Sequence, residues 1–83
     1  MTYGLGQKTD KAVYWLGELG GFDDFGLPYG TRPGPIMYDA RTAPGPWANM
    51  TPVSFDLHGG RIGQGLGQKY ELQSDGRWLK IDG

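Results

Sequence analysis

A chain of 83 residues without a single cysteine has few ways to hold a fold together. Folding buries only about 60% of the surface of so short a chain, and small domains commonly add disulfides or a metal ion to their thin core. Disulfides are excluded here, and the one histidine, His58, cannot build a zinc site without several carboxylate partners. Aromatic side chains are the remaining resource, with five Tyr, three Trp and three Phe. We therefore expect a single domain held by aromatic packing, with no metal and no other cofactor.

The charge pattern argues against nucleic acid and membranes as main partners. The formal net charge is −1, and residues of both signs are interspersed along the chain. The N-terminal sequence MTYGLG has neither a basic nor an apolar signal region, and no stretch approaches the roughly 18 apolar residues of a membrane span. We expect a cytoplasmic protein with no membrane partner.

The first element that the pattern predicts is a short helix over residues 9–20. Thr9 or Asp10 can serve as its N-cap, and apolar residues follow at helical spacing. Gly17 and the β-propensity of residues 12–16 leave a strand as the alternative.

Glycine and proline dominate residues 21–35, which predicts ordered turns with apolar anchors, and Asp23 and Asp24 there are typical of a solvated turn. A short strand is expected at 36–38. Residues 53–58 alternate apolar and polar side chains, which predicts a half-buried strand ended by glycine.

The C-terminal residues carry the clearest signal, a hairpin turning at Asp75-Gly76. A two-residue turn sets Leu72 against Leu79 and Tyr70 against Ile81 on one apolar face, and it points Trp78 away from this face. A three-residue loop mixes the two faces, so the pattern favours the two-residue turn.

One internal repeat, GLGQK at 4–8 and again at 65–69, is too short to establish a duplicated domain. We expect the two copies to run side by side as edge segments.

Catalytic patterns are weak. Ser54, Asp56 and His58 are the residue types of a nucleophilic triad, but on a strand the outer two are roughly 13 Å apart, far beyond proton-transfer reach. The glycines of residues 60–67 are not followed by the Gly-Lys-Ser/Thr of a phosphate loop. We expect that the chain is not an enzyme.

Two stretches, IMYDARTAPGPWANM at 36–50 and GLGQKYE at 65–71, with the closing DGRWLKI, resemble a family of short phage and mobile-element proteins. Proteins of this family typically resemble zinc ribbons, with two Cys-x-x-Cys knuckles. The resemblance covers roughly residues 26–83 and implies a ribbon-like β-module of short antiparallel hairpins. Residues 1–25, with the predicted helix, would pack on it, so the expected fold class is α+β, mostly β, without metal.

Aligning the family pattern on this chain places its four ligand positions at residues that cannot act as thiolates, namely Gly26, Tyr29, Thr51 and Ser54. The resemblance therefore implies the scaffold without zinc, and lost metal must be replaced by packing. The aromatic residues near these positions are the expected replacements: Phe22, Phe25, Tyr29 and Phe55.

These features favour a non-enzymatic module that binds a host or phage protein, plausibly inhibiting a host defence system in the manner of an anti-CRISPR protein. Interface hot spots favour Trp, Tyr and Arg, so the expected contact residues are Trp78, Arg77, Tyr38, Phe22 and Phe25. The alternatives are a structural part of a virion and a nucleic-acid-binding module. In the latter, rings stack on bases and basic residues touch phosphates: Trp47, Tyr70 and Trp78 with Arg61, Lys69, Arg77 and Lys80.

Overall fold

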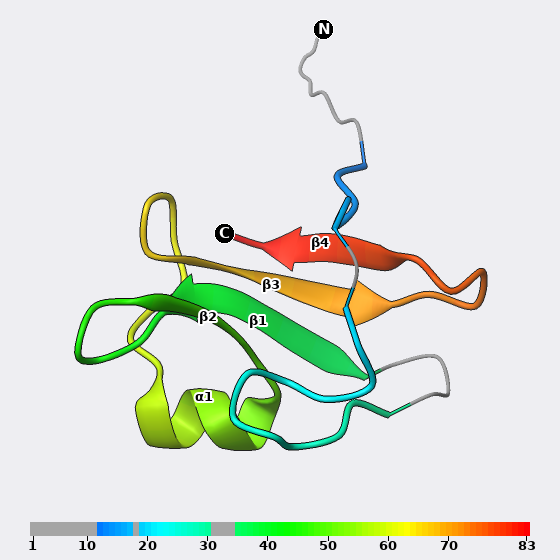
Figure 1. The fold of residues 1–83 in the computed structure, drawn as a ribbon. Coiled ribbons are helices and arrows are strands. Elements are labelled where there is room, and N and C mark those ends of the chain that lie inside the picture. The colour runs from blue at the N-terminus through cyan, green and yellow to red at the C-terminus, as the bar shows by residue number, and fades with distance from the viewer. Residues whose placement is uncertain (1–11, 18, 31–34) are drawn as a thin grey trace, which may run out of the picture.

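The computed structural model describes residues 12–17, 19–30 and 35–83. These residues form an antiparallel sheet and one short helix (Figure 1), in the order β1 (Ile36–Arg41), β2 (Trp47–Met50), α1 (Pro52–His58), β3 (Gly67–Leu72) and β4 (Trp78–Asp82). The four strands lie in the sheet in the order β2-β1-β3-β4. The predicted fold class, α+β with mostly β-structure built from antiparallel hairpins, is confirmed, but the helix is not where the sequence predicts it.

The helix α1 covers the segment predicted as a strand. The Thr51 hydroxyl accepts the N–H of Ser54 at 3.3 Å as an N-cap, and Pro52 occupies the first turn. At the other end, the N–H of Gly59 donates to the Phe55 carbonyl at 2.8 Å. A capping threonine followed by proline favours a helix start strongly enough to override alternation over only a few residues.

Because this segment is helical, its apolar residues do not share one buried face. The Phe55 ring stacks on Tyr38 of β1, with centroids 4.0 Å apart and planes at 10°, and Ser54 is fully buried. Val53 and Leu57 instead point outward, with 58% and 71% of their surfaces exposed. Residues predicted as core are therefore surface.

The predicted N-terminal helix is wrong for the part that can be seen. Residues 12–17 are extended and follow the outer edge of β4, where Tyr14 pairs antiparallel with Leu79. The N–H of Trp15 donates to the Trp78 carbonyl at 3.0 Å, and the N–H of Lys80 donates to the Val13 carbonyl at 2.7 Å. The open edge of β4 thus provides hydrogen-bond partners for the backbone of residues 12–17. The strand that their β-propensity left as the alternative to a helix is the form that is closer to the structure. Residues 9–11, and the first GLGQK copy at 4–8, lie outside the described residues.

β3 and β4 form the predicted hairpin, but the two-residue turn is wrong. The N–H of Gln73 donates to the Arg77 carbonyl at 2.8 Å, so Ser74, Asp75 and Gly76 form the loop. Gly76 has φ of 87°, and no non-glycine residue in the described ranges has a positive φ. A two-residue type I′ turn requires a positive φ at both of its central residues, and Asp75 does not have one. A three-residue loop with Gly76 in the left-handed conformation forms instead.

This loop shifts the pairing by one position from the predicted register. Leu72 lies opposite Trp78, and Glu71 lies opposite Leu79. Trp78 consequently shares a face with Tyr70 and packs edge-on against Tyr29, with ring centroids 5.5 Å apart. It does not point away from the core.

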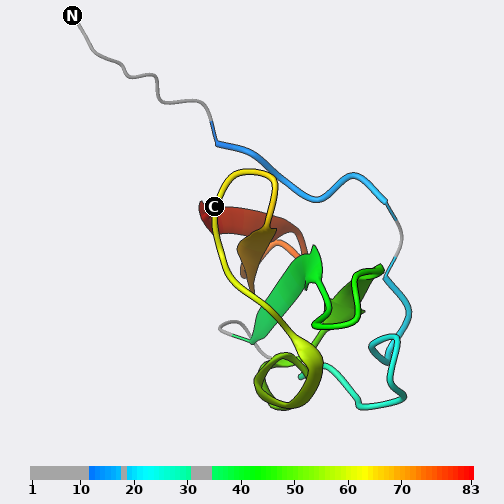
Figure 2. The ribbon, with the colours of Figure 1, turned by 90° about the vertical axis from the view of Figure 1, so that its left-hand side faces the viewer.

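α1 packs on one face of the sheet (Figure 2), and Trp15 and Tyr29 pack on the opposite face against Tyr70 and Trp78. The register places Tyr38, Ala40 and Met50 on the helix side, and Met37 and Tyr70 on the opposite side. Met37, Ala40 and Met50 are fully buried. A methionine therefore lies at the centre of the packing on each face of the sheet, Met50 on the side of α1 and Met37 on the opposite side. The composition suggested that aromatic rings form the core, but most of them form half-buried pairs around these methionines.

Candidate functional site

The most distinctive feature outside the sheet is a compact loop of residues 21–29, which we call the finger. Its ends are joined by a hydrogen bond from the Tyr29 N–H to the Gly21 carbonyl at 3.0 Å and by an antiparallel bridge between Phe22 and Pro28. Nearer the tip, the N–H of Asp23 donates to the Leu27 carbonyl at 2.7 Å. The finger is thus a small hairpin closed by its own backbone.

The carboxylate of Asp23 fastens the finger to the start of α1. One oxygen, Oδ1, accepts the N–H groups of Phe25 and Leu27, both at 2.9 Å. The other, Oδ2, accepts the N–H and the hydroxyl of Thr51, both at 2.8 Å. Asp23 is only 6% exposed, so these bonds form away from water. The predicted solvated turn is wrong at this residue, because donors from a distant segment bury its carboxylate.

Hydrogen bonding also decides the charge state of Asp23. Burial by itself raises the pKa of this carboxyl, but the hydrogen bonds from Ser54, Thr51 and Leu27 together outweigh burial and hold the pKa well below its usual range. Asp23 is therefore a carboxylate at all pH values near neutrality.

The neighbouring Asp24 closes the outer edge of β2. Its N–H donates to the Asn49 carbonyl at 3.0 Å, and its Oδ2 accepts the Asn49 N–H at 2.7 Å. Asp39 lies opposite Asn49 on β1, and burial, together with the negative charge of Asp24, raises the pKa of its carboxyl. Two adjacent carboxylates thus join the finger to the rest of the fold, Asp23 to the start of α1 and Asp24 to β2.

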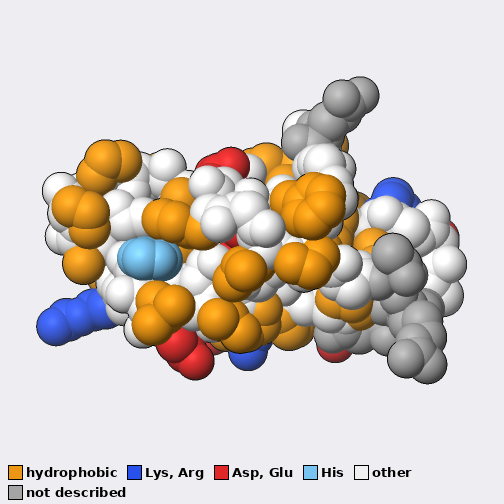
Figure 3. Space-filling model, turned by 60° about the horizontal axis from the view of Figure 1, so that its bottom comes forward, with side chains coloured by type: hydrophobic (Ala, Val, Ile, Leu, Met, Phe, Trp, Pro, Cys, Tyr) orange, Lys and Arg blue, Asp and Glu red, His pale blue; other side chains and the backbone are white. Residues whose placement is uncertain are grey.

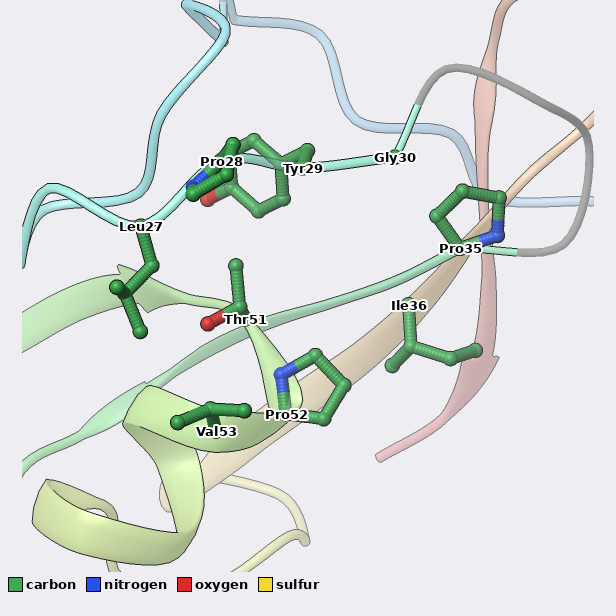
Figure 4. A pocket seen from close by; sticks show the side chains of 9 residues that line it. All are labelled: Leu27, Pro28, Tyr29, Gly30, Pro35, Ile36, Thr51, Pro52 and Val53. Atoms are coloured by element: carbon green, nitrogen blue, oxygen red, sulfur yellow. The ribbon is translucent and has the colours of Figure 1, made fainter.

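Two apolar grooves flank the finger. The first, which we call the proline groove (Figure 4), has a volume of about 430 Å³, and the finger faces the start of α1 across it. Its lining residues are Leu27, Pro28, Tyr29, Gly30, Pro35, Ile36, Thr51, Pro52 and Val53. The second, which we call the tryptophan groove, has a volume of about 280 Å³ and is lined by Phe25, Thr42, Pro44, Pro46, Trp47, Ala48 and His58. Both grooves carry almost only apolar surface.

The finger, α1 and the start of β2 together form one apolar surface, the finger face (Figure 3), on which hydrophobic side chains gather around the single histidine. In the tryptophan groove, the Phe25 ring stacks on His58, with centroids 4.1 Å apart and planes at 12°. Five large apolar side chains of this face are at least two-fifths exposed: Phe22 (65%), Phe25 (42%), Trp47 (46%), Val53 (58%) and Leu57 (71%). Such a concentration on one side of a small protein is typical of an interaction surface.

The five residues predicted to contact a partner do not come together. Phe22 and Phe25 both belong to the finger face. Tyr38 is covered by Phe55 of α1. Trp78 packs against Tyr29 at the other side of the sheet.

The fifth of these residues, Arg77, is occupied within its own hairpin. Its guanidinium binds the Asp75 carboxylate at 2.8 Å and lies 3.9 Å from the centroid of the Tyr14 ring. The Arg77 side chain thus lies against Tyr14 of the N-terminal segment while it stays 59% exposed.

The four degenerate ligand positions lie in two neighbouring segments. Gly26 and Tyr29 belong to the finger, whereas Thr51 and Ser54 begin α1, with hydroxyl oxygens 3.3 Å apart. The Asp23 carboxylate joins the two segments through hydrogen bonds. Whether this arrangement descends from a zinc ribbon stays a prediction.

Aromatic packing was expected to replace the metal at four residues, and three of them pack against another ring. Phe25 stacks on His58, Phe55 stacks on Tyr38, and Tyr29 packs edge-on against Trp78; that this packing replaces a lost metal stays a prediction. Phe22 is exposed instead. The Tyr29 hydroxyl is buried without a hydrogen-bond partner among the described residues, and burial, with the charges of Asp23 and Asp24, raises its pKa.

Ser54, Asp56 and His58 all lie on α1, so the strand geometry used to separate them does not apply. The Ser54 hydroxyl is buried against Thr51, while His58 is exposed and stacked on Phe25. No hydrogen bond joins Ser54 and His58 in this helix. The three side chains therefore do not form a nucleophilic triad.

Sequence reasoning missed Asp23, Val53 and Leu57 as parts of the site and considered Trp47 only as a base-stacking residue. The Thr51-Pro52 pair was the available signal, since a helix starting there turns Val53 and Leu57 outward. For Asp23 the sequence offers no comparable signal, because the donors from Thr51 are distant in the chain.

No group of three or more His, Cys, Asp or Glu side chains within residues 12–17, 19–30 and 35–83 is arranged to hold a metal ion. In the same ranges, no helix is both long and apolar enough to cross a membrane.

No protein-family model, curated protein or solved structure matches the chain. The resemblance to the phage and mobile-element family therefore stays a prediction.

Proposed function

We propose that this chain is a non-enzymatic module that binds a protein partner through the finger face. The observation that carries the proposal is that the finger, α1 and the start of β2 carry five of the nine large apolar side chains that are exposed among the described residues: Phe22, Phe25, Trp47, Val53 and Leu57. Exposed aromatic and aliphatic side chains beside preformed apolar grooves are the usual centre of a protein interface, with charged residues depleted.

The strand edges favour recognition by side chains over strand addition. The outer edge of β4 is paired with residues 13–15, and the outer edge of β2 is engaged by Asp24 at Asn49. A partner strand that extends the sheet needs a row of free backbone groups, and these edges offer few.

The geometry gives less support to nucleic acid as the partner. Trp47 and Trp78 lie on β2 and β4, at opposite ends of the strand order, and Tyr70 is buried. The Arg77 guanidinium is paired with Asp75. A stacking platform needs adjacent exposed rings beside free cations.

The partner that we propose is a protein of a bacterial host, with a defence complex such as a CRISPR effector as the class suggested by the family resemblance. In that role the chain acts in the host cytoplasm as an inhibitor, by occupying a surface of its target.

The experiment is affinity capture from a bacterial host lysate, followed by calorimetry with the purified captured protein. Leu57→Lys places a charge on α1 at a side chain that is 71% exposed, so that few fold contacts are lost. Ile81→Lys is the matched control, because Ile81 is 44% exposed on β4, away from α1 and β2.

We expect Leu57→Lys to raise Kd at least about tenfold, since a charge inside a desolvated apolar interface costs more than about 1.4 kcal/mol. Ile81→Lys is expected to leave Kd unchanged. Equal weakening by both variants, or by Ile81→Lys alone, would place the interface elsewhere. Capture of nucleic acid, with affinity that falls steeply as salt rises, would favour the alternative function.

A further inference from the structure

We propose that the Asp23 carboxylate is a lock that holds the finger closed against α1, and that the finger opens as a unit, separately from the sheet, when this lock is broken. The lock has a purpose only if the finger face binds a partner, so its role rests on the proposed function, whereas its existence can be tested without a partner.

The connections between the finger and the rest of the molecule are few. Within the finger, backbone bonds such as Asp23 N–H to Leu27 carbonyl need no other element. Among the described residues, the hydrogen bonds and ring pairs that join the finger to other elements are the Asp23 bonds to Thr51 and Ser54, the Asp24 pair with Asn49, and the ring pairs of Phe25 with His58 and Tyr29 with Trp78.

No strand hydrogen bond has to break when these contacts separate. The fully buried side chains of the described residues, Met37, Ala40, Met50 and Ser54, all belong to the sheet or to α1. Asp23 is the one buried residue that the finger contributes. Opening therefore removes one buried carboxylate from its donors and leaves the sheet paired, which is the condition for a local rather than a global transition.

The Asp23 carboxylate controls both sides of this junction at once. Its Oδ1 fixes the turn that carries Phe25, and its Oδ2 fixes the Thr51 end of α1. Phe25 lines the tryptophan groove and Leu27 lines the proline groove. One buried side chain thus sets the shape of both grooves, and a preformed surface binds more tightly because less motion is lost on binding.

The charge state makes this lock permanent rather than pH-switched. Hydrogen bonding holds the pKa of Asp23 well below its usual range, so neutral and mildly acidic solutions leave the carboxylate charged. The donors that face it from the finger and from α1 are backbone N–H groups and hydroxyls, which do not titrate in that range.

Amide hydrogen exchange followed by NMR tests the lock on the full chain. Asp23→Asn keeps the size of the side chain but cannot offer acceptors to all of its donors. Thr51→Val keeps the Thr51 N–H bond to Asp23 and removes the hydroxyl, which also caps α1, so its effect on the finger is judged at the Phe25 and Leu27 amides. Asp56→Asn is the control for charge, because Asp56 is an exposed carboxylate on α1 that makes no hydrogen bond to another described residue.

In Asp23→Asn we expect the Phe25, Leu27 and Thr51 amides to exchange roughly tenfold to a hundredfold faster, as the loss of hydrogen bonds to a charged group implies. The amides of β1 and β3 should keep their rates. Thr51→Val should give a smaller increase at the same amides, and Asp56→Asn none.

Unchanged exchange at Phe25, Leu27 and Thr51 in both variants would overturn the lock. An equal increase across β1 and β3 would also overturn it, because Asp23 would then stabilise the whole fold and not the finger alone. Both results come from the chain alone, without a partner. They can therefore contradict the lock while the binding experiments still support the proposed function, and the reverse also holds.

Discussion

Replacing Gly67 by alanine is expected to destabilise the sheet, because Gly67 lies directly opposite Ala40 in the β1–β3 pairing. A Cβ at position 67 meets the Cβ of Ala40 at 2.5 Å and the Arg61 carbonyl oxygen at 2.7 Å. Ala40 is fully buried, so it cannot move aside without a shift of β1. Overpacking of this kind costs about 1 to 3 kcal/mol, a large share of the roughly 3 to 5 kcal/mol that a domain of this size holds.

Urea denaturation followed by tryptophan fluorescence measures this loss. With a slope near 1 kcal/mol/M, the midpoint of Gly67→Ala should fall by about 1 to 3 M. Gly20→Ala is the matched control, because an added Cβ at position 20 meets no atom within 4 Å and should leave the midpoint unchanged.

A double-mutant cycle with Ala40→Gly tests the cause. Removing the Ala40 Cβ relieves the closest clash, so the double variant should lose less stability than the two single losses added together. If Gly67→Ala is as stable as Gly20→Ala, or if the two losses add without coupling, the pairing of Gly67 with Ala40 is refuted.

Three further predictions concern stability. Phe55→Ala removes the ring stacked on Tyr38 and should cost about 2 kcal/mol in urea denaturation, whereas the exposed Phe22→Ala should cost less than about 0.5 kcal/mol; equal costs would contradict the placement of α1. Gly76→Ala forces alanine to a φ of 87° and should cost about 1 kcal/mol, seen as a lower Tm, and an unchanged Tm would speak against the three-residue loop. Because the native pKa of Asp23 lies below that of the unfolded chain, its carboxylate stabilises the closed finger above about pH 4, and this contribution is lost as pH falls toward the native pKa; the protection of the Phe25 and Leu27 amides relative to β1 should fall in acid in the parent chain and change less in Asp23→Asn, and an identical pH profile would count against the buried carboxylate.

The hairpins were predictable from the sequence because their signals are local. Asp75-Gly76 between two alternating runs indicates β3 and β4, and residues 36–38 indicate β1. Their register was not predictable by the same means. It depends on whether Asp75 adopts a positive φ, and the bonds that it accepts from Arg77 hold the loop in another form.

The sequence predicts a helix at the N-terminus and a strand at residues 53–58, whereas the structure has an extended segment at 12–17 and a helix at 52–58. Competing signals explain both differences. Residues 53–58 alternate like a strand, but the cap at Thr51 and the proline after it begin a helix. Residues 12–17 have helical spacing, but the open edge of β4 provides backbone partners that a lone helix lacks. Tertiary contacts decide both outcomes, and they are invisible to local patterns.

For the candidate site, Phe22 and Phe25 were predictable as exposed aromatics in a turn-rich segment. Asp23 was not, since a carboxylate in a turn is usually solvated and only the position of Thr51 in the fold shows that it is buried. Tyr38, Arg77 and Trp78 were plausible from residue type alone, but each is engaged by another side chain of the chain itself.

Mapping the contact surface by NMR tests the central claim most directly. In the isotope-labelled chain, titrated with the captured partner protein, amide signals should shift or broaden in the finger, at residues 47–48 and along α1. Signals of β4 and of residues 13–15 should stay unchanged. Perturbation confined to β4 and residues 13–15, with the finger and α1 unaffected, would contradict the account.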